Sequence, residues 1–229
     1  MKIAVFGATG KTGQEIIRQA LAGGHSVVAL ARRPEALPIR HEALRIVVGD
    51  ARNADHIAAV IEGQDAVVSS LGRPAAGSTR AEVDDSEVVD VCTASTRHLF
   101  AQMPDAGVQR IVLMSTHGAG SSNDGSPYVV ALRELVGNRV ADKDDMEAFI
   151  AASDAPVDWT VIRNPLIYDG PAGQPYGVHE KIVLDDTSKV TYTDLAAFTL
   201  SEITEPKHVG KILTITEPLT GEAGPGSPS

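Results

Sequence analysis

The sequence predicts an α/β fold in which helices cover one doubly wound, mostly parallel sheet within a single domain. Short, nearly continuous apolar runs alternate with segments whose apolar residues recur at helical spacing. Repeated strand–helix units of this kind form a parallel sheet with right-handed crossovers. A chain of 229 residues is long enough for one sizeable α/β core and too short for two comfortable domains.

The first half of the chain predicts four strands. The first, residues 3–6, is an apolar run typical of a strand buried on both faces, and residues 14–22 follow it with a helical pattern. The remaining elements expected here are strands at 26–31, 44–48 and 65–71, and a helix at 54–61.

The second half predicts two long helices, 81–103 and 128–153, the second with a break near Gly137. Further elements are strands at 108–114, 158–163 and 211–216, and a helix at 193–203. Gly, Pro and Ser concentrate in the expected irregular loops, which are residues 73–80, 117–127 and 164–178. The folded domain is therefore expected to span 1–217, and 218–229 to form a disordered tail.

Three glycines, Gly7, Gly10 and Gly13, follow the first strand and open the first helix. Strand, glycine turn and helix are the context of a dinucleotide-binding fingerprint. Gly7 would end the strand in a tight turn, Gly10 would let the backbone approach a pyrophosphate, and Gly13 would let the helix pack closely on the sheet. The helix N-terminus would then face the phosphates, together with the side chains of Thr9, Lys11 and Thr12. The alternative is a glycine-rich turn without a ligand, and the spacing GxxGxxG departs from the commoner GxGxxG.

Composition narrows the class of partner. The formal net charge of −10 repels polyanions, which argues against nucleic acid or an anionic membrane and leaves a small molecule as the expected partner. One cysteine, Cys92, excludes an internal disulfide and suits a reducing cytoplasm; its apolar helical surroundings predict a buried, inert thiol. No histidine spacing suits a metal site, no Gly-x-Ser-x-Gly turn suggests a hydrolase, and neither a signal peptide nor a membrane-spanning run is expected.

The end of the second strand indicates which nucleotide is bound. An NAD site usually has a carboxylate there for the ribose 2′-hydroxyl, whereas this chain has Arg32 and Arg33. Two guanidinium groups suit a 2′-phosphate, so we expect NADP(H) over NAD(H), the alternative being ordinary surface charge. Asp50, with Ala51, is placed to contact the adenine, and Leu71–Gly72 to pass beneath the ribose and nicotinamide.

Four segments resemble the atypical short-chain dehydrogenase/reductases: residues 6–13 (FGATGKTG), 49–50 (GD), 65–68 (DAVV) and 158–165 (DWTVIRNP). The chain is most similar to the NAD(P)H-binding group that contains biliverdin-IXβ (flavin) reductase and the NmrA-like proteins, over roughly residues 1–216. The resemblance implies an NAD(P)-binding Rossmann fold with a substrate cleft over the nicotinamide, built from the three loops named above.

The family's catalytic positions match unevenly. Its active-site serine falls on Thr116, with Ser115 just before it; a hydroxyl there could bind a substrate carbonyl or the cofactor carboxamide. The Tyr-x-x-x-Lys pair is broken, since Lys143 has Arg139 at the tyrosine position. Lys143 either contacts the cofactor ribose or pairs with Glu147 one turn later.

Three further candidates follow the fifth and sixth strands. His117 titrates near neutral pH when unperturbed, so it is either a proton donor or an exposed loop residue. Asn164, Pro165, Leu166 and Ile167 are expected to pack against the nicotinamide, mainly through main chain, and Tyr168 either lines the substrate side or caps the core.

These features predict an NADPH-dependent reductase that passes hydride to a small conjugated or carbonyl compound of flavin, quinone or tetrapyrrole type. With the tyrosine missing, solvent can supply the proton. Two alternatives remain, a non-catalytic NmrA-like sensor of NADP(H) and an epimerase or isomerase that retains its NADP.

Overall fold

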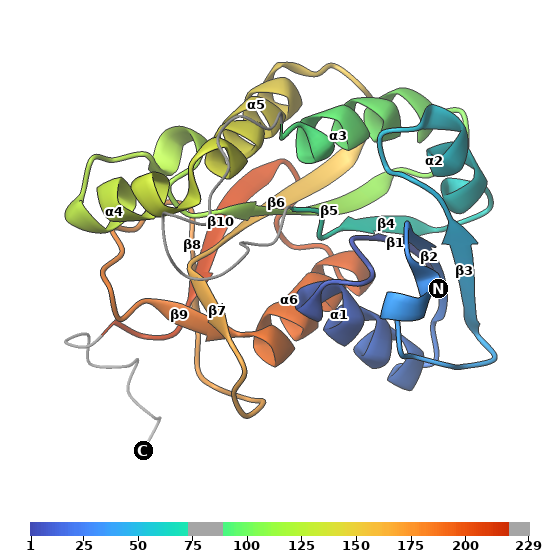
Figure 1. The fold of residues 1–229 in the computed structure, drawn as a ribbon, viewed down its shortest axis with the longest axis horizontal. Coiled ribbons are helices and arrows are strands. Elements are labelled where there is room, and N and C mark those ends of the chain that lie inside the picture. The colour runs from blue at the N-terminus through green and yellow to red at the C-terminus, as the bar shows by residue number, and fades with distance from the viewer. Residues whose placement is uncertain (73–88, 220–229) are drawn as a thin grey trace.

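The computed structural model describes residues 1–72 and 89–219, which form a central sheet between two layers of helices (Figure 1). The sheet has eight strands in the order β3-β2-β1-β4-β5-β6-β10-β8, and β8 alone among them runs antiparallel to its neighbour. Their bounds are β1 Lys2–Phe6, β2 Ser26–Ala31, β3 Leu44–Val48, β4 Ala66–Ser69, β5 Arg110–Thr116, β6 Asp158–Asn164, β8 Gly177–His179 and β10 Lys211–Thr216.

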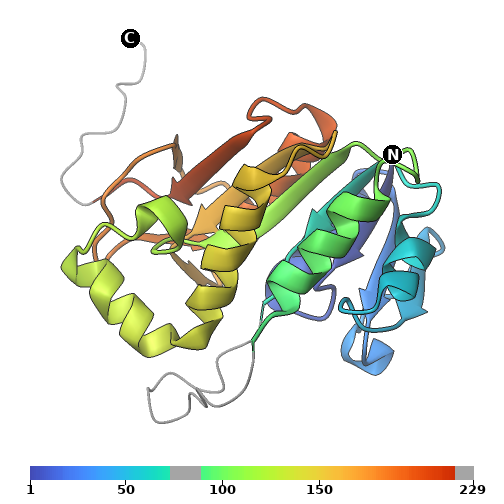
Figure 2. The same cartoon turned by 90° about the horizontal axis from the view of Figure 1, so that it is seen from above.

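Helices lie on both faces of the sheet, as Figures 1 and 2 show. α1 (Lys11–Ala22) and α6 (Tyr192–Thr204) pack together on one face, while α2 (Ala54–Ile61), α3 (Val91–Gln102) and α5 (Asn138–Ala152) cover the other. Each face buries its own apolar cluster, one around Ile16, Ile17 and Leu195 and one around Ile57, Leu99 and Met146. The predicted doubly wound α/β fold is confirmed.

The strand order reverses between β1 and β4, which places a crevice at the carboxyl ends of these two strands. Gly7 turns the chain there with φ +81°, and a Cβ on it would lie 2.5 Å from the carbonyl oxygen of Ser70. A Cβ on Gly13 would collide with the carbonyl oxygen of Gly7, so both glycines are required by the packing of the chain itself. Gly10 differs, because a Cβ there would meet only that carbonyl oxygen, at an ordinary 3.5 Å.

The helix expected at 81–103 begins later than predicted, at Val91. Val89 and Asp90 lie outside it, and residues 81–88 fall outside the described chain, as does the expected loop 73–80. Asp142 of α5 fixes the start, since its carboxylate accepts the backbone N–H groups of Cys92 and Thr93 at 2.9 Å each. A cap supplied from 50 residues away cannot be read from the local sequence.

The break expected in the helix at 128–153 is confirmed. α4 (Pro127–Val136) and α5 are separate helices, divided at Gly137, whose φ of +60° lies in the region that favours glycine. Ser126 caps α4, its side chain accepting the backbone N–H of Val129.

The expectation that 164–178 is wholly irregular is wrong. β7 (Leu166–Tyr168) pairs in parallel with β9 (Lys189–Thr191) as a separate two-stranded sheet, and β8 begins at Gly177. Both strands take their hydrogen bonds from distant partners, which outweigh the local turn signals of the prolines and glycines. Of the predicted tail, residues 220–229 lie outside the described chain.

Candidate functional site

Two cavities meet over the crevice at the carboxyl edge of the sheet. One, of about 670 Å³, lies at the ends of β1, β2 and β3, and the other, of about 1330 Å³, at the ends of β4, β5 and β6. They share the residues of the junction and so form one continuous cleft; these are Gly10, Ser70, Leu71, Gly72 and Val89.

Every residue expected to hold the cofactor lines this cleft. The smaller cavity has Gly7, Thr9, Arg32, Arg33, Asp50 and Ala51. The larger has Lys11, Thr12, Gly13, Asn164, Pro165, Leu166 and Ile167, and Gly10, Leu71 and Gly72 line both. The sequence pattern therefore brings together residues from five separate segments of the chain.

The N-terminus of α1 faces the junction of the cavities. Gly10 is its N-cap residue and no side chain caps the helix. The first-turn amides of a helix have no intrahelical partner and carry the positive end of the helix dipole, so they suit a phosphate.

Arg32 and Arg33 are exposed at the rim of the smaller cavity. Neither forms an ion pair or a side-chain hydrogen bond within the described ranges, so both guanidinium groups are available to an anion. Asp50 is partly engaged, because its Oδ1 accepts the backbone N–H of Arg52 at 2.9 Å. Arg52, which the sequence did not point to, also lines this cavity. Its Nη1 lies 3.6 Å from Asp90 Oδ1.

Lys143 lies on the floor of the larger cavity and is nearly buried. Its Nζ donates to the carbonyl oxygens of Leu71 at 2.8 Å and Met114 at 2.7 Å, at the ends of β4 and β5. The alternative that Lys143 pairs with Glu147 is wrong, because Glu147 instead binds the guanidinium of Arg163. The ammonium is thus fixed between two strand ends, within the cleft.

Ser115 and Thr116 line the same cavity but differ in their hydrogen bonds. The Ser115 Oγ donates to Glu147 Oε1 at 2.6 Å, and all of these atoms are buried. Thr116 is half-buried, and its Oγ1 has only long contacts, 3.3 Å to the carbonyl oxygen of His117 and 3.5 Å to that of Asn164. The Thr116 hydroxyl is therefore the freer donor.

His117 lines neither cavity and is only 1% exposed. Its Nδ1 lies 3.1 Å from Thr214 Oγ1, and its ring packs against Tyr128 with 6.2 Å between centroids. Burial lowers the pKa of His117 to about 4, so the expectation that it titrates near neutral pH is corrected. The side chain is a neutral core residue at pH 7.

The outer wall of the larger cavity differs from the expected loops. Of 117–127 only Pro127 contributes, and of 164–178 only the first four residues. The wall is mainly one face of α4 together with the chain after β8, formed by Tyr128, Ala131, Leu132, Leu135, Val136, Leu184, Asp185, Asp186 and Ser188. The apolar spacing on α4 was visible in the sequence, but spacing alone does not distinguish a cleft wall from a core face.

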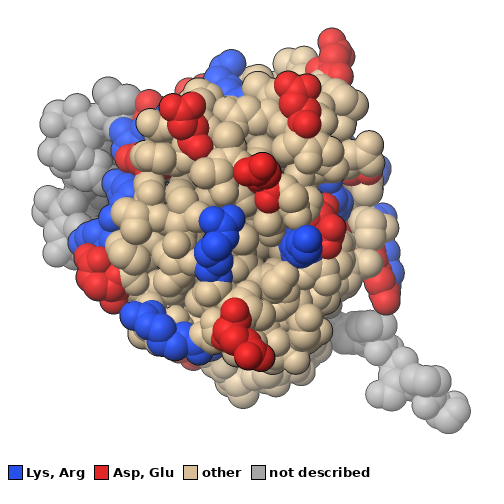
Figure 3. Space-filling model, turned by 90° about the vertical axis from the view of Figure 1, so that its right-hand side faces the viewer, with Lys and Arg blue, Asp and Glu red and all other residues tan. Residues whose placement is uncertain are grey.

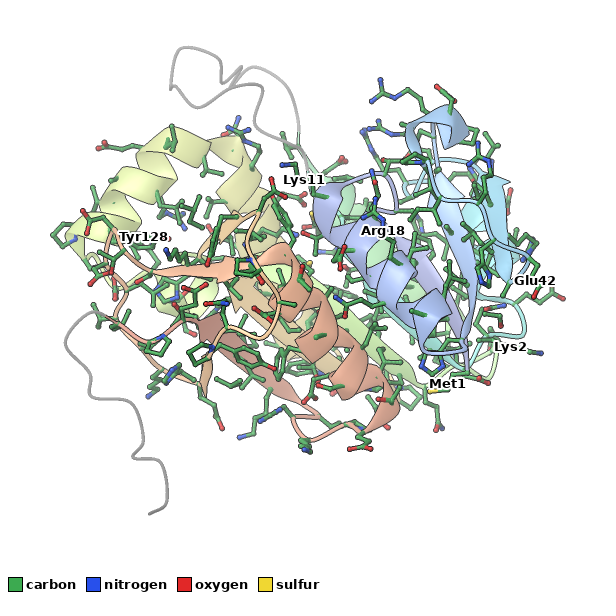
Figure 4. The ribbon with its side chains drawn as sticks, turned by 90° about the horizontal axis from the view of Figure 1, so that it is seen from below. Met1, Lys2, Lys11, Arg18, Glu42 and Tyr128 are labelled. Atoms are coloured by element: carbon green, nitrogen blue, oxygen red, sulfur yellow. The ribbon has the colours of Figure 1, made fainter. Side chains whose placement is uncertain are left out.

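Lys11 joins the glycine turn to the segment that follows β7. Figure 4 shows it at the start of α1, with Arg18 farther along that helix and Tyr128 at the start of α4. Its Nζ lies 2.6 Å from Asp169 Oδ2, just after β7, and 5.4 Å from the centre of the Tyr192 ring. Both charged groups are exposed.

Two other candidates have structural partners. Tyr168 lines neither cavity, and its hydroxyl donates to Glu217 Oε1 at 2.7 Å. Cys92 is buried as expected, and burial raises the pKa of its thiol to about 11, which keeps it protonated.

Three further features of the described residues concern surface charge, metal ligands and membrane spans. The face in Figure 3 carries basic and acidic side chains interspersed, without a concentrated basic area. Within residues 1–72 and 89–219 no three His, Cys, Asp or Glu side chains gather as metal ligands would, and no helix there combines the length and apolar character needed to cross a membrane.

The buried histidine predicts a pH-dependent stability. Because the pKa of His117 is about 4 in the folded chain and near 6.5 when unfolded, the unfolded chain binds more protons between these values. The contribution of neutral His117 to the free energy of unfolding is complete above pH 6.5. It falls by up to roughly 3 kcal/mol as the pH drops toward 4. Urea unfolding at pH 7 and at pH 5 measures how much of the free energy of unfolding is lost between the two pH values. This loss should be smaller for His117→Asn than for the parent. The control His41→Asn, at an exposed histidine, should lose as much as the parent.

Comparisons with known proteins identify the family of the chain. The family model described as NAD(P)H-binding matches residues 7–206. The chain is 26% identical to the uncharacterized protein YwnB of Bacillus subtilis, covering 94% of this chain and 98% of that one. It is also 26% identical to (4-alkanoyl-5-oxo-2,5-dihydrofuran-3-yl)methyl phosphate reductase of Streptomyces griseus, covering 94% and 68%.

Among solved structures, ChuY of Escherichia coli, described as an anaerobillin reductase, superposes with a TM-score of 0.77 over 97% of this chain and 100% of that one. At 21% identity this likeness is one of fold. The family match extends over most of the chain and includes the glycine turn at its start. The protein therefore belongs to the NAD(P)H-binding family and has the Rossmann fold, which is consistent with the resemblance to the atypical short-chain dehydrogenase/reductases.

Proposed function

We propose that this protein is an NADPH-dependent reductase that passes hydride to a small conjugated or carbonyl substrate. The observation that carries the proposal is the continuity of the cleft. A dinucleotide that follows it from Arg32 past the α1 N-terminus would bring its nicotinamide into the larger cavity. That cavity, of about 1330 Å³, has room for a second molecule beside the ring.

The preference for NADPH rests on Arg32 and Arg33. Their guanidinium groups are exposed at the cavity rim, where the ribose 2′-phosphate of NADPH would lie. Charge-assisted, forked hydrogen bonds to a phosphate are stronger than those between neutral groups.

The side chains of the larger cavity suit a positioning role. Lys143, held by two carbonyl oxygens, has N–H donors for the ribose hydroxyls beside the nicotinamide. Thr116 can donate to a carbonyl of the substrate, and the apolar face of α4 excludes water from one side. When bound, the nicotinamide supplies the hydride. With Arg139 at the family's tyrosine position, and His117 buried outside the cleft, we assign the proton to solvent.

The absence of that tyrosine favours a second candidate function, an NmrA-like sensor that binds NADP(H) without turnover. The size of the substrate-side cavity favours the reductase, because a sensor has no need of space beside the ring. The reductase names of ChuY and of the Streptomyces griseus relative support the same choice.

Calorimetric titration with NADPH and NADH, followed by loss of NADPH absorbance in the presence of flavin, quinone or biliverdin, distinguishes the candidates. The reductase is expected to bind NADPH more tightly and to oxidise it with at least one compound of these classes. Binding without turnover on any of them would identify the sensor, and failure of both nucleotides to bind would exclude both.

The glycine turn gives a sharper prediction. Gly10→Val should remain folded, since a Cβ there has space, and should lose only about 1 kcal/mol because valine is a poor N-cap. It should nevertheless abolish NADPH binding by filling the approach of the pyrophosphate. The matched variant Gly13→Ala should instead lose stability, by roughly 1–3 kcal/mol, through its collision with Gly7. Normal NADPH affinity in folded Gly10→Val would contradict the placement of the phosphates.

Arg32→Glu should raise the dissociation constant of NADPH by about tenfold or more, as expected for the loss of a charged hydrogen bond. The dissociation constant of NADH should change little. Arg18→Glu on α1 is the control, because it makes the same change in net charge outside both cavities. Calorimetry on the two variants measures the four dissociation constants. Equal weakening of NADPH and NADH by Arg32→Glu would remove the assignment of the 2′-phosphate.

A further inference from the structure

Helix α4 carries an apolar face that lines the larger cavity. The helix lies at the edge of the fold, where it packs against α5 (Figures 1 and 2). Five of its residues recur at i, i+3, i+4, i+7 and i+8, which is the spacing of one helix face. All five line the cavity, and we call them the α4 strip: Tyr128, Ala131, Leu132, Leu135 and Val136.

Within the described residues the α4 strip is not part of the apolar core. Leu132 and Val136 are half-buried, yet neither belongs to the apolar clusters on the two faces of the sheet. Leu135 is 40% exposed. An amphipathic helix normally buries its apolar face against a core. Here that face is turned toward the cavity, so its side chains are available to a ligand.

The same cavity has apolar side chains from other parts of the chain. Leu166 and Ile167 come from β7, and Leu184 comes from the segment after β8. Leu166 is 62% exposed, so a second large apolar side chain is open to water at this cavity. Apolar surface that gathers in one cavity in this way is typical of a ligand-binding site.

The α4 strip is extended and uncharged. Residues 128–136 span about 12 Å along the helix axis, at about 1.5 Å per residue. The one polar side-chain group of the strip is the Tyr128 hydroxyl. Burial raises the pKa of Tyr128, and the nearby Asp185 adds to this effect, so the phenol is neutral at pH 7. Such a surface suits an extended, uncharged chain better than a compact polar group.

We propose that the substrate carries an uncharged apolar chain, of alkyl or prenyl type, that lies along the α4 strip while the reacting ring or carbonyl lies beside Thr116 and Lys143. The cavity of about 1330 Å³ exceeds the roughly 300–1,000 Å³ of a usual small-molecule site, as expected if nicotinamide, ring and chain share it. The chain would remove the exposed surface of Leu135 and Leu166 from water. The inference rests on the proposed reductase function and narrows its substrate class.

A series of 2-methyl-1,4-naphthoquinones tests this, because methyl, butyl, octyl and dodecyl groups at position 3 change the chain and leave the reacting ring the same. The kcat/KM for NADPH oxidation should rise at least about tenfold from methyl to octyl, since each buried methylene favours binding. The rise should level off toward dodecyl, where the chain extends beyond the strip. Calorimetric titration of the NADP⁺-bound protein with the methyl and butyl compounds should show the same trend without turnover.

Leu135→Gln and Val130→Gln form a matched pair of variants on α4. Both side chains are exposed, to 40% and 48%, but Leu135 lines the larger cavity and Val130 lines neither. Glutamine is a good helix former, so both variants should fold. Leu135→Gln should lower the octyl-to-methyl ratio of kcat/KM by roughly threefold or more, because it removes apolar surface that the chain would cover. Val130→Gln should keep the ratio of the parent.

The outcomes separate this inference from the proposed function. NADPH oxidation that does not depend on chain length, a rise that continues without levelling off, or an equal fall of the ratio in both variants would overturn the inference and leave the reductase in place. Chain-dependent binding to the NADP⁺-bound protein, with no NADPH oxidation by any compound of the series, would instead contradict the reductase.

Discussion

The close approach of α1 to β1 is the constraint on which the rest of the cleft depends. Gly13 lies so near the carbonyl of Gly7 that no side chain fits between them, and the carbonyl of Ser70, just after β4, leaves no space for a side chain on Gly7. Ser70 adds its own hydrogen bonds, donating from Oγ to the carbonyl of Phe6 at 3.1 Å. These contacts hold three segments together where the strand order reverses, and so fix the direction in which the helix N-terminus points.

On the face of the sheet opposite α1, helix α5 carries three buried charged side chains, each with a different partner. Asp142 caps α3, Lys143 joins the ends of β4 and β5, and Glu147 pairs with Arg163. Burying charges is costly unless each is paired or fully hydrogen-bonded, so these contacts limit how the helix can sit on the sheet. The position of α5 in turn sets the floor of the larger cavity.

The sequence predicted the parts of the molecule that depend on local chemistry. The glycine turn, the alternating strands and helices and the break at Gly137 follow from backbone conformation and apolar spacing, and the residues chosen for the nucleotide all line the cleft. The start of α3, strands β7 and β8 and the α4 wall were missed or misplaced, because each depends on partners far away in the chain. Lys143 is a further example. Its spacing to Glu147 suits an ion pair, but the Glu147 carboxylate binds Arg163 of β6 instead. The burial that makes His117 neutral likewise depends on distant residues, such as Thr214 of β10, and does not follow from the local sequence.

The contact between Lys11 and Asp169 has a thermodynamic consequence. The ammonium group of Lys11, at the start of α1, is bound to the carboxylate of Asp169, which lies 158 residues away and just after β7. Any anion that binds beside the glycine turn competes with Asp169 for that ammonium. Occupation of the turn and release of the segment after β7 are then linked reciprocally, so that each favours the other by the same free energy. Because both groups face water, added salt weakens this coupling.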